Sequence, residues 1–275
     1  MKPPDFAYHR PQDVDEAVSM LGELAPDVKV LAGGQSLMPM LNMRLLSPAN
    51  VVDINFADGF PGVEVGDAYV EVGALVRQRE LETHAGAAEA CPLLVQALRF
   101  VAHKPIRARG TVVGSVVHAD PAAELPAVLA LLDGVVVAQG PAGRREIAAD
   151  EFFRGYFETA LAPDELATAV RFRRFAAGER SAFVETSRRS GDFALCGAAA
   201  VVNGSSARVA LTGVGASPHV QDVSGLLAGD GEAALGELES KLEPEPDIHA
   251  SADFRRHLAK ELTRRAVAAA RGGGG

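Results

Sequence analysis

The sequence predicts an α+β protein with two domains, because two kinds of segment follow one another along the chain. Over the first 176 residues, short apolar strands alternate with glycine-bearing loops and amphipathic helices. Beyond them, three strand-like runs lie close together and two helical stretches follow. We therefore expect a first domain over residues 1–176, with subdomains of about 1–55 and 56–176, and a second domain over 177–275.

The first elements form a strand–helix–strand unit. A helix is expected over residues 11–24, with Asp13 as its cap and Glu16 completing a capping box. One face of this helix is apolar, at Val14, Ala17, Val18 and Leu21. Residues 28–32 and 50–55 read as buried strands, and residues 36–46 between them as one or two helical turns. Two glycines thus lie where the first of these strands ends.

The next elements are a hairpin and several separate strands. Alternating valines around a Gly-Asp turn predict a hairpin over residues 62–75. A strand is expected at Val135–Gln139, and residues 167–175 read as an edge strand whose arginines face water. Three further strands fall within residues 181–215, with a hairpin turn at Asn203-Gly204. An amphipathic helix over residues 253–270 ends the pattern.

Composition and charge restrict the possible functions. The 275 residues are 48% hydrophobic and 23% charged, and the net charge of −9 would repel a long phosphate polymer, so no nucleic-acid partner is expected. The N-terminus lacks the apolar run of a secretory signal, and no run is long enough to span a bilayer. We expect a cytoplasmic protein. The two cysteines, Cys91 and Cys196, are too few for an iron–sulfur cluster, and no metal site is predicted.

The stretch Ala32-Gly33-Gly34-Gln35-Ser36 has the features of an anion-binding turn. Successive backbone N–H groups between a strand and a helix can form a concave nest. Glycine lets a phosphate approach without a Cβ in the way, and the hydroxyl of Ser36 can donate one more hydrogen bond. A pyrophosphate would suit such a site. A tight turn without a ligand is the alternative.

A second segment with similar features lies about 75 residues further along. Gly110 and Gly114 allow close backbone approach, and Thr111 and Ser115 offer hydroxyl groups. Arg107 and Arg109 could offset phosphate charge, while Asp120 and Glu124 could accept hydrogen bonds from a ribose. Two such segments suggest one extended dinucleotide held at two points.

Together, these segments resemble the FAD-binding medium subunits of molybdenum hydroxylases, the aerobic carbon monoxide dehydrogenase and xanthine dehydrogenase family. The resemblance covers about residues 3–270, and its motifs occur in the family's order. They are LAGGQSLMPMLNMRL with NVVDIN, HKPIRARGTVVGSVVHADPAAELPAVLALLD, FFRGYFETALAPDEL and RRSGDFAL.

The resemblance implies a vanillyl-alcohol-oxidase-like (PCMH-type) FAD-binding fold in two subdomains, followed by a three-stranded antiparallel sheet with helices. It places the FAD pyrophosphate in the loop Ala32–Ser36 and a second FAD segment at Thr111–Ser115. The isoalloxazine ring would lie beside Asp192 and Phe193. The residues that the resemblance assigns to FAD are Ala32, Gly33, Gly34, Gln35, Ser36, Val101, Thr111, Val112, Val113, Gly114, Ser115, Glu124, Asp192 and Phe193.

The resemblance also implies an oxidoreductase subunit that transfers electrons. Substrate oxidation would occur at a molybdopterin cofactor in a large partner chain, and electrons would reach FAD through 2Fe-2S clusters in a small partner chain. The acceptor would be a quinone, NAD or oxygen, and the assembly a dimer of heterotrimers. No side chain of this chain is then expected to act as acid or base on the substrate, so no catalytic residue is predicted.

Three positions depart from the family pattern. Val113 stands where relatives carry Gly, and a β-branched residue disfavours positive φ, which would weaken FAD binding if the loop needs it. Glu185 stands where many relatives carry Lys, and Phe193 replaces a Tyr. Two alternatives remain at this point: a stand-alone flavin oxidoreductase, and a scaffold subunit that has lost FAD.

Overall fold

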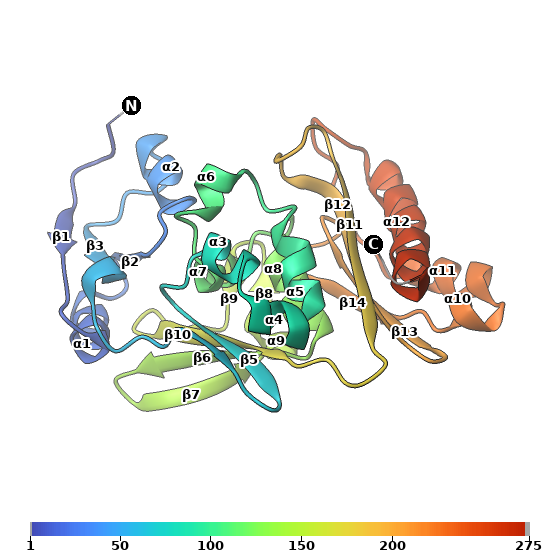
Figure 1. Cartoon of the computed structure of the whole chain (residues 1–275). Helices are drawn as coiled ribbons and strands as arrows, with labels where there is room; N and C mark the ends of the chain where they lie inside the picture. Colours follow the sequence, from blue (N-terminus) through green and yellow to red (C-terminus); the bar gives the residue numbers. More distant parts are fainter. Residues whose placement is uncertain (1, 273–275) are drawn as a thin grey trace.

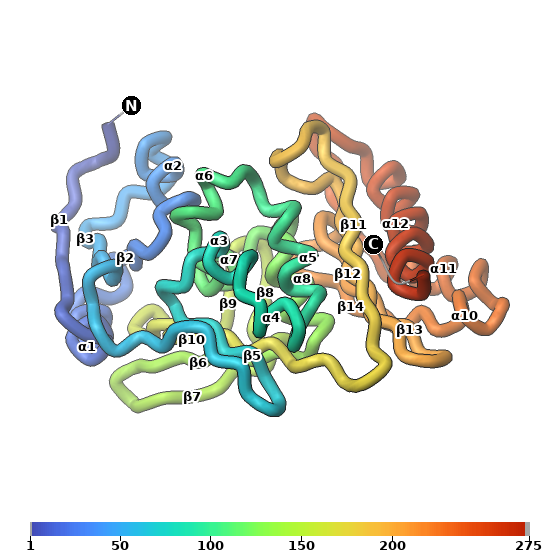
Figure 2. Tube along the Cα trace, in the orientation of Figure 1, coloured from blue at the N-terminus to red at the C-terminus, as the bar shows by residue number. Residues whose placement is uncertain are grey.

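The structure is a computed structural model, and it describes residues 2–272. Figure 1 shows three parts: a small N-terminal sheet, a central part in which helices lie over a larger sheet, and a C-terminal sheet with a long helix. In the tube of Figure 2, the N-terminal and C-terminal parts lie on opposite sides of the central helices. The α+β class predicted from the sequence is confirmed.

The N-terminal part is a three-stranded parallel sheet in the order β1-β3-β2. Its strands β2 and β3 and its two helices confirm the predicted strand–helix–strand unit, whereas β1 was not predicted because it is only three residues long. Asp13 caps α1 by accepting a hydrogen bond from Glu16 N at 2.8 Å, and the Glu16 carboxylate reaches back to Gln12 N. The elements are β1 (Ala7–His9), α1 (Val14–Leu24), β2 (Val28–Leu31), α2 (Leu37–Asn42), β3 (Asn50–Asp53) and the 3₁₀ helix η1 (Ile54–Phe56).

The central sheet has five strands in the order β4-β5-β10-β6-β7. These are β4 (Val63–Val65), β5 (Tyr69–Gly73), β6 (Val135–Gly140), β7 (Gly143–Ala148) and β10 (Leu166–Arg173). The predicted hairpin is confirmed, with Val63 opposite Val72. The prediction that β10 is an edge strand is wrong, because it is the middle strand. Its Arg171 pairs with Glu71 on β5 and Glu146 on β7, so this arginine is held by carboxylates of other strands.

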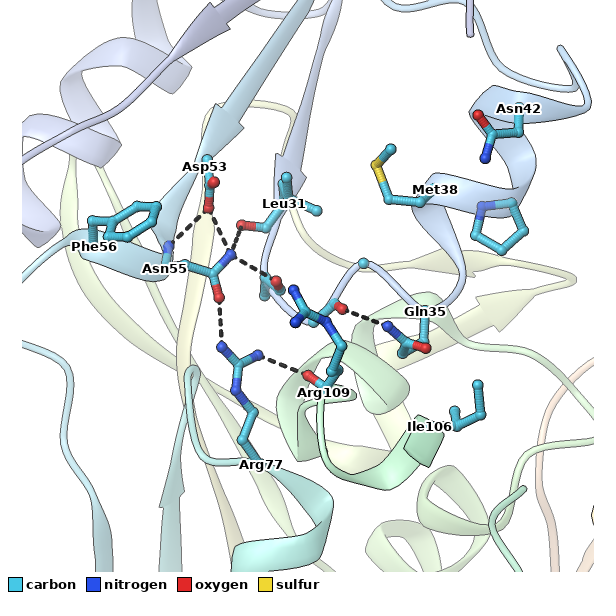
Figure 3. Close-up of a pocket in the computed structure, with 14 residues that line it drawn as sticks. Leu31, Gln35, Met38, Asn42, Asp53, Asn55, Phe56, Arg77, Ile106 and Arg109 are labelled. Atoms are coloured by element: carbon cyan, nitrogen blue, oxygen red, sulfur yellow. Dashed lines mark hydrogen bonds between the residues drawn. The ribbon is translucent and has the colours of Figure 1, made fainter. Parts of the chain in front are cut away.

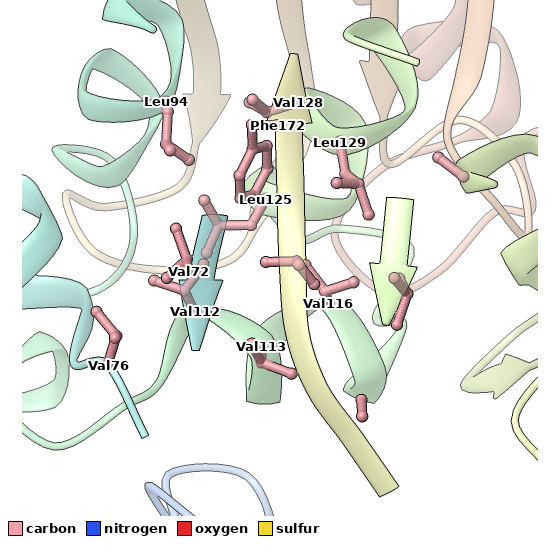
Figure 4. Close-up of a cluster of buried hydrophobic side chains, with 14 of the residues drawn as sticks. Val72, Val76, Leu94, Val112, Val113, Val116, Leu125, Val128, Leu129 and Phe172 are labelled. Atoms are coloured by element: carbon pink, nitrogen blue, oxygen red, sulfur yellow. The ribbon is translucent and has the colours of Figure 1, made fainter. Parts of the chain in front are cut away.

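Helices cover this sheet and enclose the main core. Figure 4 shows Leu125, Val128 and Leu129 of one helix meeting Phe172 of the middle strand. Burial of such side chains contributes roughly 1.5–3 kcal/mol each. The elements of this part are α3 (Gln78–Glu82), α4 (Ala85–Ala90), α5 (Pro92–Leu98), α6 (Lys104–Arg107), α7 (Val112–His118), α8 (Glu124–Leu131), α9 (Ala149–Phe152), β8 (Phe153–Gly155) and β9 (Glu158–Thr159).

The C-terminal sheet is antiparallel and has four strands in the order β11-β12-β13-β14, so the prediction of three strands is wrong by one. The turn at Asn203-Gly204 is confirmed. The fourth strand was missed because its four residues, HVQD, do not alternate clearly. The elements are β11 (Arg180–Ser187), β12 (Ala194–Asn203), β13 (Ser206–Thr212), β14 (His219–Asp222), α10 (Gly225–Ala228), α11 (Gly231–Ser240) and α12 (Ala252–Gly272).

Strand β12 is buried on both faces because its side chains are small. Ala198 and Ala200 belong to the core beneath α12, whereas Ala199 and Val201 belong to the main core of the central part. The C-terminal sheet therefore lies between α12 on one face and α5 and α8 on the other. Both cysteines are buried and unpaired, and burial raises the pKa of the Cys196 thiol to about 12. This agrees with an inert thiol.

Candidate functional site

The loop Ala32–Ser36 joins β2 to α2, as predicted. Gly34 has a φ of +71°, a conformation that favours glycine. Among the residues that the structure describes, none accepts a hydrogen bond from the backbone N–H of Gly33, Gly34, Gln35 or Ser36. Neighbouring N–H groups that point away from the protein's own acceptors form an anion-binding concavity. The loop thus has donors to offer to an anion.

Gly33 brings the two glycine-bearing segments into contact. A methyl group on Gly33 would stand 2.5 Å from the carbonyl oxygen of Arg109, 2.8 Å from Gly110 Cα and 2.9 Å from Thr111 N. Because all three neighbours are backbone atoms, only glycine allows this approach without movement of the chain. The two segments that the sequence singled out therefore meet at one place, although about 75 residues separate them.

A cavity of about 710 Å³ opens beside this contact. Figure 3 shows that its walls come from the N-terminal sheet, from α2 and from the segments around Arg77 and Arg109. Four predicted residues, Ala32 to Gln35, line it, and Ser36 follows at the start of α2 without capping it. Its other lining residues are Leu31, Met38, Pro39, Asn42, Asp53, Asn55, Phe56, Arg77, Ile106 and Arg109.

A hydrogen-bond network fixes one wall of the cavity. The Arg77 guanidinium donates to the carbonyl oxygen of Arg109 at 2.7 Å and to Asn55 Oδ1 at 2.6 Å. Asn55 Nδ2 in turn donates to the carbonyl oxygen of Ala32 at 2.7 Å. Arg77 and Asn55 thus tie the two segments together (Figure 3). Neither residue was expected to bind there, because their hydrogen bonds join positions 22 residues apart or more.

The cavity is cationic at its mouth. Burial and the charge of Arg109 lower the pKa of Arg77. The single carboxylate in the lining, Asp53, accepts a hydrogen bond from Tyr8 Oη at 2.7 Å. The Arg10 guanidinium lies 3.7 Å from the ring centroid of Phe56, another lining residue. An anion with an apolar or aromatic part fits these walls.

Of the two arginines expected near phosphate, only Arg109 lies at the cavity. Arg107 is buried, and it pairs with Glu82 at 3.0 Å and donates to the carbonyl oxygen of Val101 at 2.7 Å. Arg107 is therefore a structural residue, and the expectation that it faces a phosphate is wrong. Val101 itself is buried beside this bond.

The second segment is a helix rather than a loop. Thr111 Oγ1 accepts a hydrogen bond from Gly114 N at 3.1 Å and so caps α7, whose first residues are Val112, Val113 and Gly114. Val113 has no positive φ, and its side chain is buried in the main core (Figure 4). The segment therefore needs no positive φ at this position, and a helix accepts a β-branched residue at small cost.

The remaining predicted residues lie away from the cavity lining. Gly191 packs on the ring of His103, where a methyl group would stand 2.3 Å from the ring carbon Cε1, so the loop that carries Asp192 and Phe193 covers the segment after α5. Phe193 is 70% exposed. Ser115 is half-buried on α7. The loop with Asp192 and Phe193 thus lies against His103, two residues after Val101, in what is called here the second region.

Two carboxyl groups come from α8 and β11, two elements that both pack on α5. Glu124, the first residue of α8, is 7% exposed, and burial raises its pKa to about 7. Burial and the charge of Glu124 raise the pKa of Glu185 on β11 to about 8. Glu185 Oε2 is buried and has no hydrogen-bond partner among the described residues. The two regions of the candidate site therefore differ in charge.

Comparison with known proteins gives two family matches. Residues 4–172 match the family described as the FAD binding domain in molybdopterin dehydrogenase. Residues 181–270 match the CO dehydrogenase flavoprotein C-terminal domain.

Individual relatives match along almost the whole chain. The 6-hydroxypseudooxynicotine dehydrogenase complex subunit alpha of Paenarthrobacter nicotinovorans is 37% identical, covering 98% of this chain and 96% of its own. The carbon monoxide dehydrogenase medium chain of Hydrogenophaga pseudoflava is 34% identical, covering 98% of each. A solved structure, the reconstituted CO dehydrogenase from Oligotropha carboxidovorans, superposes with a TM-score of 0.94 at 30% identity, covering 99% of this chain and 100% of that chain.

Proposed function

Because the chain belongs to the family of FAD-binding domains in molybdopterin dehydrogenases, we propose that it passes electrons from the iron–sulfur clusters of a partner chain to an external acceptor through FAD. The family matches and the relatives confirm three predictions from the sequence: the family, the oxidoreductase class and FAD as the cofactor. Bound FAD would supply the redox chemistry, and this chain would supply binding, orientation and the local electric field.

The cofactor's diphosphate fits the loop Ala32–Ser36. Its N–H groups are without acceptors among the described residues, and Gly33 lets the backbone of Arg109–Thr111 approach the loop closely. This is the observation that carries the proposal for the site. The Arg109 guanidinium at the cavity mouth supplies a positive charge toward the same anion. Arg77 acts through Asn55 and the Arg109 backbone, and it is a positioning residue.

The ring end of the cofactor would reach the second region. We assign Val101, Thr111, Val112, Val113, Gly114, Ser115, Glu124, Asp192 and Phe193 to this part of the cofactor site. The contact of Gly33 with Thr111 supports the assignment, because a ligand leaving the loop next meets the start of α7. So does the packing of Gly191 on His103, which brings the loop with Asp192 and Phe193 beside the segment after Val101.

The proposed partners are a small iron–sulfur chain and a large molybdopterin chain, assembled as a dimer of heterotrimers. Two cysteines in the whole sequence are too few to bind the clusters here. Within residues 2–272, no helix has the length and apolarity needed to cross a membrane. We propose a cytoplasmic complex whose large chain selects the substrate. We also propose a domain boundary near residue 176, since β10 ends at Arg173 and β11 begins at Arg180.

Separation of the subunits tests the proposal. The complex is purified, its chains are separated under mild conditions, and the visible spectrum of each is recorded. The flavin spectrum is expected with this chain, and denaturation is expected to release FAD from it. Flavin found with another chain would overturn the proposal. A colourless chain that also takes up no added FAD would favour a scaffold instead.

A further inference from the structure

A carboxylate, Asp53, lies in the wall of the cavity that the proposed function assigns to the diphosphate of FAD. Asp53 is the last residue of β3 and is 6% exposed. Because like charges repel, a carboxylate placed there for its charge alone would weaken the binding of a diphosphate. The hydrogen bonds of Asp53 indicate a different role.

Asp53 holds the neighbouring residue Asn55. Its Oδ1 accepts hydrogen bonds from Asn55 Nδ2 at 2.6 Å and from the Asn55 backbone N–H at 3.0 Å (Figure 3). At the other end of the same amide, Asn55 Oδ1 accepts from the Arg77 guanidinium at 2.6 Å. A carboxylate can only accept and a guanidinium can only donate, so these two neighbours allow the Asn55 amide one orientation.

This orientation turns Asn55 Nδ2 toward the glycine-bearing loop. Asn55 Nδ2 donates to the carbonyl oxygen of Ala32 at 2.7 Å and to that of Leu31 at 3.4 Å. The Ala32 carbonyl and the Gly33 N–H belong to one peptide unit, and in a planar trans unit the two groups point in opposite directions. By holding the carbonyl, Asn55 therefore turns the Gly33 N–H to the opposite side, where no described residue accepts it.

The next peptide unit of the loop is held in the same way by another amide. Gln35 Nε2 donates to the carbonyl oxygen of Gly33 at 3.0 Å, so the N–H of Gly34 points away from Gln35 Nε2 (Figure 3). Two side-chain amides thus hold the carbonyl ends of two consecutive peptide units. The N–H ends of these units stay available to an anion.

We propose that Asp53 is a positioning residue of this site, which acts through Asn55 to direct the Gly33 N–H at the anion. That the anion is a diphosphate rests on the proposed function. The Asp53 carboxylate is engaged by three hydrogen bonds, two from Asn55 and one from Tyr8 Oη. Asp53 then strengthens anion binding in spite of its charge, because it fixes the direction of a backbone donor.

Two substitutions at one position separate the acceptor from the charge. Asp53→Leu removes both, whereas Asp53→Asn removes the charge and keeps an oxygen that can accept from Asn55. Titration of the full-length chain with FAD should give a dissociation constant about tenfold higher for Asp53→Leu and within about threefold of wild type for Asp53→Asn. Unchanged or tighter binding by Asp53→Leu overturns the proposal, and so does an equal loss in the two variants.

Asp27→Leu is the matched control for Asp53→Leu. It removes an aspartate acceptor from the same part of the chain, because Asp27 Oδ1 accepts from the backbone N–H of Ala49 at 3.0 Å. Asp27 does not belong to the cavity lining. The FAD affinity of this variant should equal that of wild type. A loss as large as that of Asp53→Leu would mean that any loosening of the N-terminal part weakens binding, which overturns the proposal.

A double variant tests whether Asp53 acts through Asn55. Asn55→Leu should weaken FAD binding at least as much as Asp53→Leu, and the double variant should bind no more weakly than Asn55→Leu alone. Losses that multiply in the double variant would show that Asp53 acts on its own and would contradict the proposal. Unchanged FAD affinity in Asn55→Leu also overturns it, and this result does not depend on the folding of Asp53→Leu.

The side-chain amide of Asn55 gives a readout that needs no cofactor. The chain has four asparagines, so selective isotope labelling of asparagine gives four side-chain amide signals in the full-length protein. The Asn55 signal, identified by its loss in Asn55→Leu, should exchange with water about tenfold more slowly than that of the exposed Asn203. This protection should be lost in Asp53→Leu and kept in Asp27→Leu.

The exchange measurement and the titration with FAD fail in different ways. Fast exchange of the Asn55 amide in wild type, or protection that survives Asp53→Leu, overturns the role of Asp53. Failure of wild type to bind FAD overturns the proposed function, and the exchange measurement then still decides whether Asp53 fixes Asn55.

Discussion

The two regions of the proposed cofactor site offer FAD chemically different groups. Around Gly33 and Gly34 the chain offers backbone N–H groups and the guanidinium of Arg109, all of which attract negative charge. Around Glu124 and Glu185 it offers side-chain carboxyls whose pKa values burial raises to about 7 and about 8. One region therefore suits the charged diphosphate, and the other suits a polar ring without fixed charge.

The comparison shows why the first region is easier to detect in a sequence. Backbone recognition leaves a local pattern, because the glycines must be consecutive and must lie between a strand and a helix. The carboxyl groups of Glu124 and Glu185 leave no local pattern, because one residue begins α8 and the other lies on β11, about 60 residues further along the chain.

Arg107→Gln should have the largest effect, because Arg107 lies between the two regions. It is 5% exposed, pairs with Glu82 and binds the carbonyl oxygen of Val101. Removal breaks the ion pair with the half-buried Glu82, which keeps Arg79 as a partner, and leaves the carbonyl oxygens of Val101 and Ala102 without their donor, so we expect a loss of about 3 kcal/mol of unfolding free energy. Urea unfolding of the full-length chain measures the loss. A loss below about 1 kcal/mol would mean that Arg107 is not a structural link between the regions.

Gly33→Ala should abolish most FAD binding, because it disturbs the contact of the first region with the segment around Thr111. Its methyl group would stand 2.5 Å from the Arg109 carbonyl oxygen, so the two segments must separate. We expect the FAD dissociation constant to rise about 100-fold, or about 2.8 kcal/mol. Gly62→Ala is the matched control, since nothing lies within 4 Å of that position. Equal affinity in the two variants would contradict the role of the loop.

Arg109→Gln should weaken FAD binding without loosening the fold. Arg109 is exposed at the cavity mouth, so the unfolding free energy of the variant should differ from that of wild type by less than about 0.5 kcal/mol. The dissociation constant should rise about tenfold at low salt, and the difference from wild type should shrink at high salt. Titration with FAD at two ionic strengths measures this. A salt-independent effect would show that Arg109 does not act through its charge.

Phe193→Ala should have the smallest effect on stability. The side chain is 70% exposed, so the unfolding free energy should stay within about 0.5 kcal/mol of wild type. Beside the ring, however, its loss should shift the visible absorption bands of bound FAD, because water replaces an apolar neighbour of the ring. A spectrum equal to that of wild type at full FAD occupancy would place the ring away from Phe193.

Much of the fold could be predicted from local patterns. The cap at Asp13, the hairpin around Gly66-Asp67 and the turn at Asn203-Gly204 were each correct, because each depends on residues that are close in sequence. The position of β10 could not be predicted in this way. Its arginines resemble those of a solvent-facing edge, and the acids that pair with Arg171 lie on two other strands.

The site was predictable to a similar degree. The two glycine-bearing segments were found, and their contact through Gly33 agrees with one ligand held at two points. Arg77 and Asn55 were not found, because their hydrogen bonds link positions 22 residues apart or more. The effect of Val113 on the backbone could not be decided from the sequence, since a motif comparison does not reveal that its segment begins a helix.

A structure of the chain with FAD bound tests the central claim most directly. We predict that the diphosphate oxygens accept hydrogen bonds from the backbone N–H groups of Gly33 and Gly34, with the Arg109 guanidinium nearby. A diphosphate bound elsewhere, with these two N–H groups facing water, would contradict the account.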